Sequence, residues 1–159
     1  MRSNSTDWIM NSGASKHFTH VLSDFSNIEY FDGPELTTTA QKASLKVKGV
    51  GTVFLTHFIK HKDGSSRRVT TLLHPVYYVP GMSTRLLSMG KLLLNGYSII
   101  GDANIMKFYE KNCRSPSLSV EPHAPGQTIF WLNATVTSSQ SLVSYSTIDS
   151  ENYDLWHKR

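Results

Sequence analysis

The stretch from Trp8 to Phe18 constrains this chain more than any other part of the sequence. Its apolar start, Trp8-Ile9-Met10, is typical of a short buried strand, and a polar Asn11-Ser12-Gly13 step follows at once. Glycine permits a tight turn at this point, so strand packing would hold the small side chain of Asn11 still. The stretch therefore predicts a rigid loop that presents Asn11 at the end of a strand.

Length and composition predict a single domain with an appendage. The chain has 159 residues, of which 39% are hydrophobic, and this is enough for a sizeable core. No apolar run approaches the roughly 20 residues of a membrane-spanning helix, and residues 1–7 lack the apolar centre of a signal peptide. The single cysteine, Cys113, excludes an internal disulfide and fits a reducing compartment. We therefore expect a cytoplasmic protein with no membrane partner.

The charge of the chain is mildly positive, with a formal net value of +4. Arg67-Arg68 and Lys158-Arg159 are the densest basic segments, and neither is interleaved with aromatic residues as a nucleic-acid platform would be. A solvated basic surface is the preferred interpretation, and we expect no direct contact with nucleic acid.

Most of the chain is predicted to form short strands separated by turns. Three hairpins are expected, with turns at residues 41–44, at Asp63-Gly64 and at residues 101–104. Further strands are expected at residues 75–79 and 128–132, with a loop at 112–128 and a flexible segment at 137–150. Gly49-Val50-Gly51 indicates a bulge or a close backbone approach. The pattern predicts a mainly β domain, in the form of a partly closed barrel.

One helix is expected, from Arg85 to Asn95. Leucine is dense in this segment and forms a wide apolar face, and Asn95-Gly96 supplies a stop signal. Core packing explains these leucines.

Three motifs lie in order along the chain. They are WIMNSGASKH at residues 8–17, YVPGMSTRLLS at residues 78–88 and LWHKR at residues 155–159. In sequence and spacing they resemble the retropepsin-like protease of Ty/copia-type retrotransposon polyproteins, followed by the opening of the pre-integrase region. The sequence departs from that family's pattern at Asn11, where the family has the catalytic Asp, and at Arg85, where it has Asn.

The resemblance implies a retropepsin-like (acid protease) closed barrel with one short C-terminal helix, assembled as a homodimer. It implies a protease core at residues 1–100, a β-hairpin and loop extension at 101–136, and a flexible linker into the pre-integrase region at 137–159. The implied function is an aspartic endopeptidase that processes its own Gag-Pol polyprotein in a virus-like particle.

The resemblance also assigns site residues. Asn11, Ser12 and Gly13 would form the catalytic loop, and Ala14 would leave room for substrate backbone. A flap would be centred on Gln41, Lys42 and Ala43 and would bind substrate, with residues 49–51 as the alternative flap tip. No metal and no cofactor are expected.

The family's chemistry requires two carboxyl groups that share one proton. The sequence holds one such motif per chain, so the resemblance implies a C2 homodimer whose other partner is an extended peptide segment of the polyprotein. An amide cannot lose or share that proton, so the protease is expected to be inactive with Asn11. An engineered exchange, natural decay and a domesticated descendant all remain open as its origin. The rival hypotheses are a non-enzymatic peptide- or protein-binding module and a merely structural segment of the polyprotein.

Overall fold

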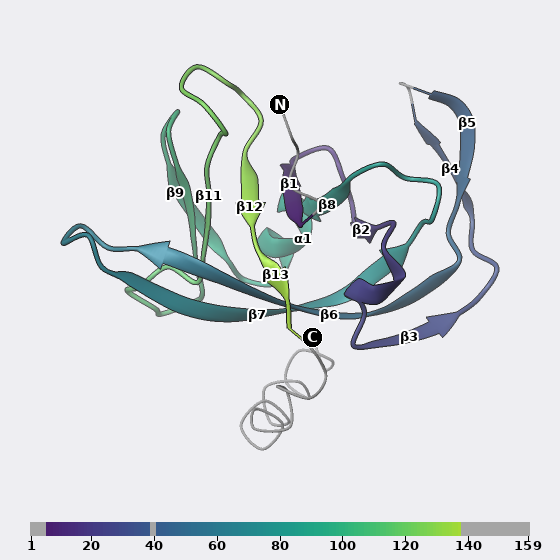
Figure 1. Cartoon of the computed structure of the whole chain (residues 1–159), viewed down its shortest axis with the longest axis horizontal. Helices are drawn as coiled ribbons and strands as arrows, with labels where there is room; N and C mark the ends of the chain where they lie inside the picture. Colours follow the sequence, from purple (N-terminus) through teal and green to yellow (C-terminus); the bar gives the residue numbers. More distant parts are fainter. Residues whose placement is uncertain (1–5, 39–40, 138–159) are drawn as a thin grey trace.

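The computed structural model describes residues 6–38 and 41–137, and this part of the chain is mainly β with one short α-helix (Figure 1). In chain order the elements are β1 (Asp7–Asn11), β2 (His17–Thr19), the 3₁₀ turn η1 (Leu22–Asp24), β3 (Asn27–Tyr30), β4 (Glu35–Thr38), β5 (Gln41–Lys46), β6 (Gly49–Lys60), β7 (Ser66–Tyr78), β8 (Arg85–Ser88), α1 (Met89–Leu94), β9 (Ser98–Gly101), β10 (Met106–Tyr109), β11 (Leu118–Val120), β12 (Trp131–Asn133) and β13 (Thr135–Val136). The predicted mainly β class with one short helix is confirmed.

The largest sheet curls into a half-barrel. Its strand order is β12-β1-β8-β2-β7-β6-β13, and β3 pairs with β6 outside this path. The pairs β1·β8 and β2·β7 are parallel, whereas β2·β8 is antiparallel. Strands β1, β8 and β2 are therefore neighbours in the centre of the sheet, and the loop that leaves β1 lies beside the end of β8.

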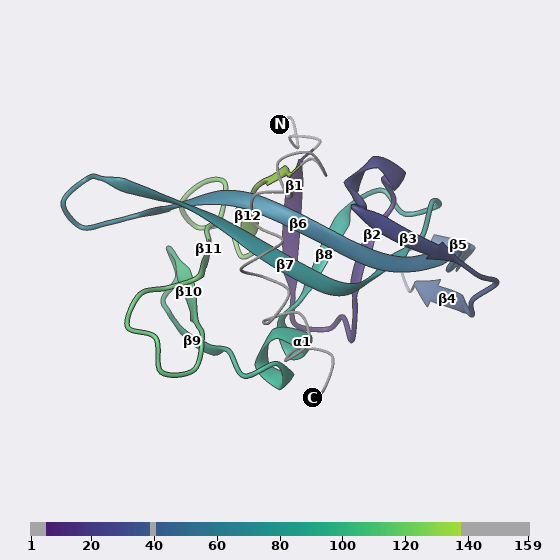
Figure 2. The same ribbon diagram turned by 90° about the horizontal axis from the view of Figure 1, so that it is seen from below.

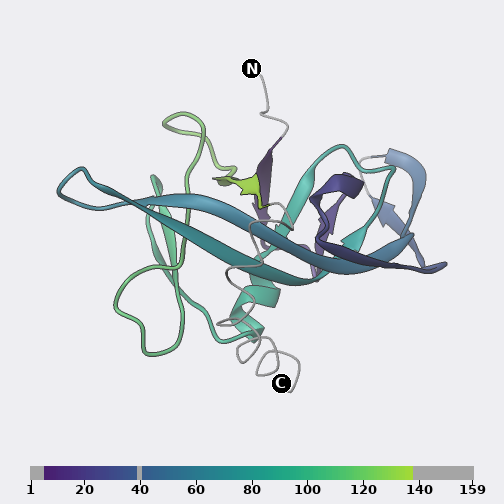
Figure 3. The ribbon, with the colours of Figure 1, turned by 60° about the horizontal axis from the view of Figure 1, so that its bottom comes forward.

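The hairpin of β6 and β7 runs the length of the molecule. From below, the β9–β11 side lies near one end of this hairpin and β3, β4 and β5 lie near the other (Figure 2). The predicted Asp63-Gly64 turn is confirmed: Gly64 has a φ of +87°, and the amide of His61 donates to the carbonyl of Ser65 at 2.8 Å. The hairpin end with this turn projects beyond the rest of the sheet (Figure 3).

Strand β7 corrects one prediction. We expected separate strands before and after Pro75, but β7 continues through it. Pro75 lies where the register between β6 and β7 shifts, between the pairs Gly51↔Val76 and Val53↔Leu73. The ladder is already interrupted at this point, so a residue without an N–H is tolerated inside the strand.

The same register shift confirms the predicted bulge near Gly51. A β-carbon at Gly51 would lie 2.0 Å from the carbonyl oxygen of Asn27 on β3. Glycine is therefore required for β3 to approach β6. Residues 49–51 pair with both β3 and β7, so they lie inside the sheet and not at a hairpin tip.

Two smaller sheets accompany the half-barrel: β4-β5 and β11-β10-β9. The predicted hairpin at residues 97–109 is confirmed by β9 and β10. The predicted loop at residues 112–128 is wrong in part, because β11 lies within it and pairs with β10. The strand predicted at 128–132 begins later, as β12.

The β4-β5 hairpin corrects the position of the predicted flap tip. Thr38 pairs with Gln41, so residues 41–43 are not the tip of this hairpin, and residues 39–40 lie outside the described residues. Gln41, Lys42 and Ala43 are part of β5 itself. The polar run at 41–44 predicts a turn, but pairing with β4 makes these residues part of a strand, and a local pattern does not record that pairing.

The predicted helix begins four residues later than expected. Residues 85–88 form β8, which pairs with β1, and only Met89–Leu94 are helical. The Ser88 side chain accepts a hydrogen bond from the amide of Lys91 at 3.0 Å and so caps α1. An apolar run such as Leu86-Leu87 fits a buried strand as well as a helix, and the pairing with β1 decides between them. In the described part of the chain, no helix is long and apolar enough to cross a membrane.

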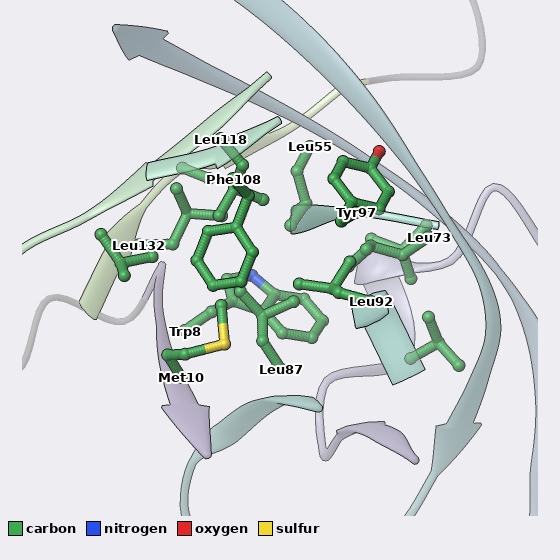
Figure 4. Packing of buried hydrophobic residues seen from close by; sticks show 14 residues of the cluster. Trp8, Met10, Leu55, Leu73, Leu87, Leu92, Tyr97, Phe108, Leu118 and Leu132 are labelled. Atoms are coloured by element: carbon green, nitrogen blue, oxygen red, sulfur yellow. The ribbon is translucent and has the colours of Figure 1, made fainter. Parts of the chain in front are cut away.

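The main apolar core lies inside the curl of the half-barrel, and Trp8 stands at its centre (Figure 4). It combines the central strands with α1 and with the segments after residue 101. Its buried members are Trp8, Met10, Val53, Leu55, Leu73, Val76, Leu87, Leu92, Tyr97, Phe108, Leu118, Val120, Leu132 and Ala134. A second cluster of Phe18, Leu45, Val47 and Val79 joins β5 to β2. The division at residue 100 stays a prediction, and the linker at 137–159 lies almost wholly outside the described residues.

Candidate functional site

The loop from Asn11 to Ala14 leaves the end of β1 and turns toward β2. Asn11 is the last residue of β1 and lies opposite Ser88 of β8 in the parallel register. Its side-chain oxygen Oδ1 accepts a hydrogen bond from the amide of Gly13 at 2.7 Å, which closes a tight turn. Ser12 and Gly13 are exposed, whereas Asn11 and Ala14 are half-buried. The amide side chain thus shapes the loop that carries it.

Ser88 of β8 holds this loop in place through hydrogen bonds of its side chain. Its hydroxyl donates to the carbonyl oxygen of Ala14 at 2.6 Å and accepts from the amide of Lys91 at 3.0 Å. Ser88 itself is fully buried, whereas its two hydrogen bonds are part-buried because Ala14 and Lys91 are partly exposed. One side chain therefore connects the loop, β8 and the start of α1.

His17 supplies a second contact to the same strand. Its Nδ1 accepts a hydrogen bond from the backbone amide of Ser88 at 3.0 Å, which places the ring proton on Nε2. Burial and, to a smaller extent, the positive charge of Lys91 together lower the pKa of His17 to about 4. The imidazole is therefore neutral near pH 7 and serves as an acceptor.

A buried ion pair lies further along β2 and β8. The guanidinium of Arg85 donates to both carboxylate oxygens of Asp24, from Nε at 2.6 Å and from Nη2 at 3.0 Å. The hydroxyl of Thr19 donates to Asp24 Oδ2 at 2.6 Å. Both charged groups are buried, and the bidentate geometry satisfies them together. The pair ties η1 to β8 and so helps to hold β2 in place.

The sequence-predicted site residues fall into two separate places. Asn11, Ser12, Gly13 and Ala14 form one continuous loop on the half-barrel. Residues 41–43 belong to the two-stranded β4-β5 sheet. That sheet contacts the half-barrel through Leu45 and the second apolar cluster.

Sequence reasoning missed the side chains that hold the loop. The sequence predicts an irregular segment around Asp24 and a helix that includes Arg85 and Ser88. No local signal identifies these contacts, because Asp24 and Arg85 are 61 residues apart and Ser88 and Ala14 are 74 apart. Ser88 itself carries a local N-cap signal, but the leucine-rich run from Arg85 predicts an earlier helix start.

The chemistry that the loop can perform is hydrogen bonding. None of the side chains from Asn11 to Ala14 can be ionised, so none can act as a general acid or base near neutral pH. Among the described residues, the Asn11 Nδ2 group makes no hydrogen bond within the protein. No group of three or more His, Cys, Asp or Glu in residues 6–38 and 41–137 could hold a metal ion.

Comparison with known protein families identifies the chain. Residues 8–97, more than half of its length, match the family model described as the β-barrel domain of the Pol polyprotein. The chain belongs to this family. The match begins at Trp8 and ends at Tyr97, so it includes the Asn11 loop, the long hairpin and α1. No curated protein and no solved structure matches the chain.

Membership of the Pol β-barrel family corrects the identification made from the sequence motifs. The match is to a barrel domain of a retrotransposon Pol polyprotein and not to its protease domain, and it identifies no catalytic activity. The prediction of a retropepsin-like aspartic endopeptidase, inactivated by Asn11, is therefore wrong. The motifs correctly indicated the Pol polyprotein, but they did not distinguish its barrel domain from its protease.

Proposed function

We propose that this Pol β-barrel domain is a non-enzymatic binding module that holds an extended peptide segment of its own polyprotein. The observation that carries the proposal is the construction of the Asn11 loop. Buried Ser88, whose amide donates to His17, fixes the loop through the Ala14 carbonyl oxygen, and the loop offers amide and hydroxyl groups and no ionisable group. A rigid polar surface of this kind suits the backbone of a peptide, because little entropy is lost on binding.

The Asn11 side chain has a defined role in this proposal. Its Oδ1 is used by the Gly13 amide, so Nδ2 is the group that would donate to a carbonyl oxygen of the bound peptide. Ser12 and Gly13 would add backbone groups on the exposed side of the loop. The β4-β5 hairpin, which includes Gln41, Lys42 and Ala43, is the proposed second wall of the peptide site.

Isothermal titration with overlapping peptides from the Pol polyprotein tests this function. We expect one or more peptides to bind, and Asn11→Ala to weaken their binding about tenfold through loss of the donor and of the turn. Asn104→Ala, in the exposed turn between β9 and β10, is the matched control and should leave affinity unchanged. An unchanged peptide affinity in the Asn11→Ala variant would show that the peptide does not bind at this loop.

Incubation of the Asn11→Asp variant with the same peptides separates binding from catalysis. We expect this variant to bind without cleaving, from acidic to neutral pH. Specific cleavage that a transition-state-mimic inhibitor blocks would overturn the proposal of a non-enzymatic module. The closed barrel and the C2 homodimer stay predictions, and sedimentation of the same samples measures the mass of the assembly.

A further inference from the structure

We propose that the projecting end of the β6-β7 hairpin binds single-stranded nucleic acid. The proposal concerns the outer face of this hairpin, defined here as Phe58, Lys60 and Arg68, together with Lys62 in the turn. It departs from the sequence-based expectation that the chain makes no direct contact with nucleic acid. The departure follows from strand register, which the sequence alone did not supply.

The two faces of the hairpin end have opposite environments. On one face His57 and Ile59 are buried, and the guanidinium of Arg67 donates to the carbonyl oxygen of Pro116 at 2.7 Å. This face is turned toward the rest of the protein. Successive residues of a strand point to opposite sides, so Phe58 and Arg68 lie on the other face.

An aromatic ring and basic side chains meet on this outer face. Phe58 pairs with Arg68 across the two strands, and Lys60 pairs with Ser66 one step further out on the same face. Phe58 is 65% exposed, and Lys60 and Arg68 are exposed as well. Phe58 therefore belongs to neither apolar cluster of the domain, and its ring faces water.

The hairpin end carries a strong net positive charge. Residues 60–68 contain four Lys and Arg side chains against a single acid, Asp63, and so carry a formal charge of +3 with His61 neutral. The Asp63 carboxylate accepts hydrogen bonds from the amide and the hydroxyl of Ser65, at 2.9 and 2.6 Å. It therefore stabilises the turn. A polyanion is the complementary partner for such a surface.

The exposed ring of Phe58 indicates which class of polyanion fits this surface. Cations alone would suit any acidic partner, but an exposed aromatic face among them provides a stacking surface for a base while Lys and Arg contact the phosphates. Duplexes hide their bases, so single-stranded RNA or DNA is the form that can use the ring. The side chains of this face are exposed, and the hairpin end that carries them projects beyond the rest of the sheet (Figure 3).

Fluorescence anisotropy with labelled 20-nucleotide oligouridine and oligothymidine tests the proposal on the full chain. We expect binding at low salt, with a slope of log affinity against log salt of about −2. Phe58→Leu keeps an apolar side chain but removes the ring, and we expect it to weaken binding about tenfold. Tyr30→Leu is the matched control, since Tyr30 is 63% exposed but lies on β3, and it should leave affinity unchanged.

Two adjacent arginines test whether binding takes place on the outer face of the hairpin. Arg68→Ala and Arg67→Ala remove the same charge, but only Arg68 lies on the outer face. We expect Arg68→Ala to weaken binding more and to reduce the salt slope by about 0.7, the contribution of one phosphate contact. Equal effects of the two variants, with no effect of Phe58→Leu, would indicate a diffuse charge effect and overturn the proposed site.

Other polyanions complete the test. Polyglutamate and vesicles containing phosphatidylserine should compete only weakly with the labelled oligonucleotide, and their binding should be the same in the Phe58→Leu variant. Competition as strong as that of the oligonucleotide would assign the surface to an acidic protein or to a membrane, and absence of oligonucleotide binding at low salt would overturn the proposal. Circular dichroism of each variant checks folding, which we expect to be unchanged because these side chains are exposed.

Discussion

Ser88 is the residue on which the Asn11 loop depends. Its hydroxyl both donates to Ala14 and caps α1, so Ser88→Ala removes two part-buried hydrogen bonds at once. We expect the free energy of unfolding to fall by about 2 kcal/mol, from the loss of a helix cap and of one further part-buried hydrogen bond. Urea denaturation measures this loss. Ser83→Ala, at an exposed position, is the control, and equal effects of the two variants would contradict the role assigned to Ser88.

The buried histidines make stability depend on pH. Burial lowers the pKa values of His17 and His57 to about 4, whereas an unfolded histidine titrates near 6.5. Between these values the unfolded chain binds protons that the folded chain excludes. Their contribution to stability is therefore complete above about pH 6.5 and is lost as pH falls toward 4.

Denaturation at pH 7, 6 and 5 tests this dependence. Between about pH 6.5 and pH 4, each histidine should reduce the free energy of unfolding by up to about 1.4 kcal/mol for each unit by which the pH falls. His57→Leu should remove one such contribution and flatten the profile, whereas His61→Leu, in the exposed turn, should not change it. A profile that His57→Leu leaves equally steep would show that this residue does not titrate as expected.

At the scale of elements, Gly51 allows β3 to join the half-barrel. A β-carbon there would meet the backbone of Asn27 at 2.0 Å, and backbone cannot move aside as a flexible side chain can. We expect Gly51→Ala to destabilise the protein by more than about 2 kcal/mol and to expose the amides of β3 to hydrogen exchange.

Gly90 in α1 provides the matched control for this substitution. A β-carbon there would come no closer than 3.9 Å to the nearest atom, the hydroxyl oxygen of Ser88. Gly90→Ala should therefore be neutral or stabilising by up to about 1 kcal/mol, because alanine favours a helix. Similar losses in the two variants would argue against the steric explanation for Gly51.

At the scale of the whole molecule, the segments after residue 101 complete the main core. Phe108, Leu118, Val120 and Leu132 are buried in it, and β12 forms an antiparallel pair with β1. A chain ending at Gly101 would expose the apolar surface that these four side chains cover. Each represents on the order of 2 kcal/mol of burial, against a typical total stability of about 5–15 kcal/mol.

We therefore expect the chain ending at Gly101 to lack a cooperative unfolding transition. Calorimetry and near-ultraviolet circular dichroism measure this loss, and a chain ending at Thr137, which keeps every packed segment described here, is the control. Cooperative unfolding of the shorter chain would show that residues 1–101 are an independent domain, in agreement with a boundary near residue 100.

The sequence alone determined the features that depend on neighbours in the chain. The Asp63-Gly64 turn, the bulge at Gly51 and the Asn11 turn were all predictable, because a few adjacent residues set the backbone conformation. The motifs around Asn11 and Arg85 also pointed to a Pol polyprotein. They could not show which of its domains this was.

Only the tertiary structure decided the features that depend on distant segments. Residues 85–88 became a strand because β1 pairs with them, and the Asp24–Arg85 ion pair joins segments 61 residues apart. The register of β6 and β7 likewise brought Phe58 opposite Arg68. These contacts form because burial and strand pairing are optimised over the whole chain, and no local pattern records which distant segments will meet.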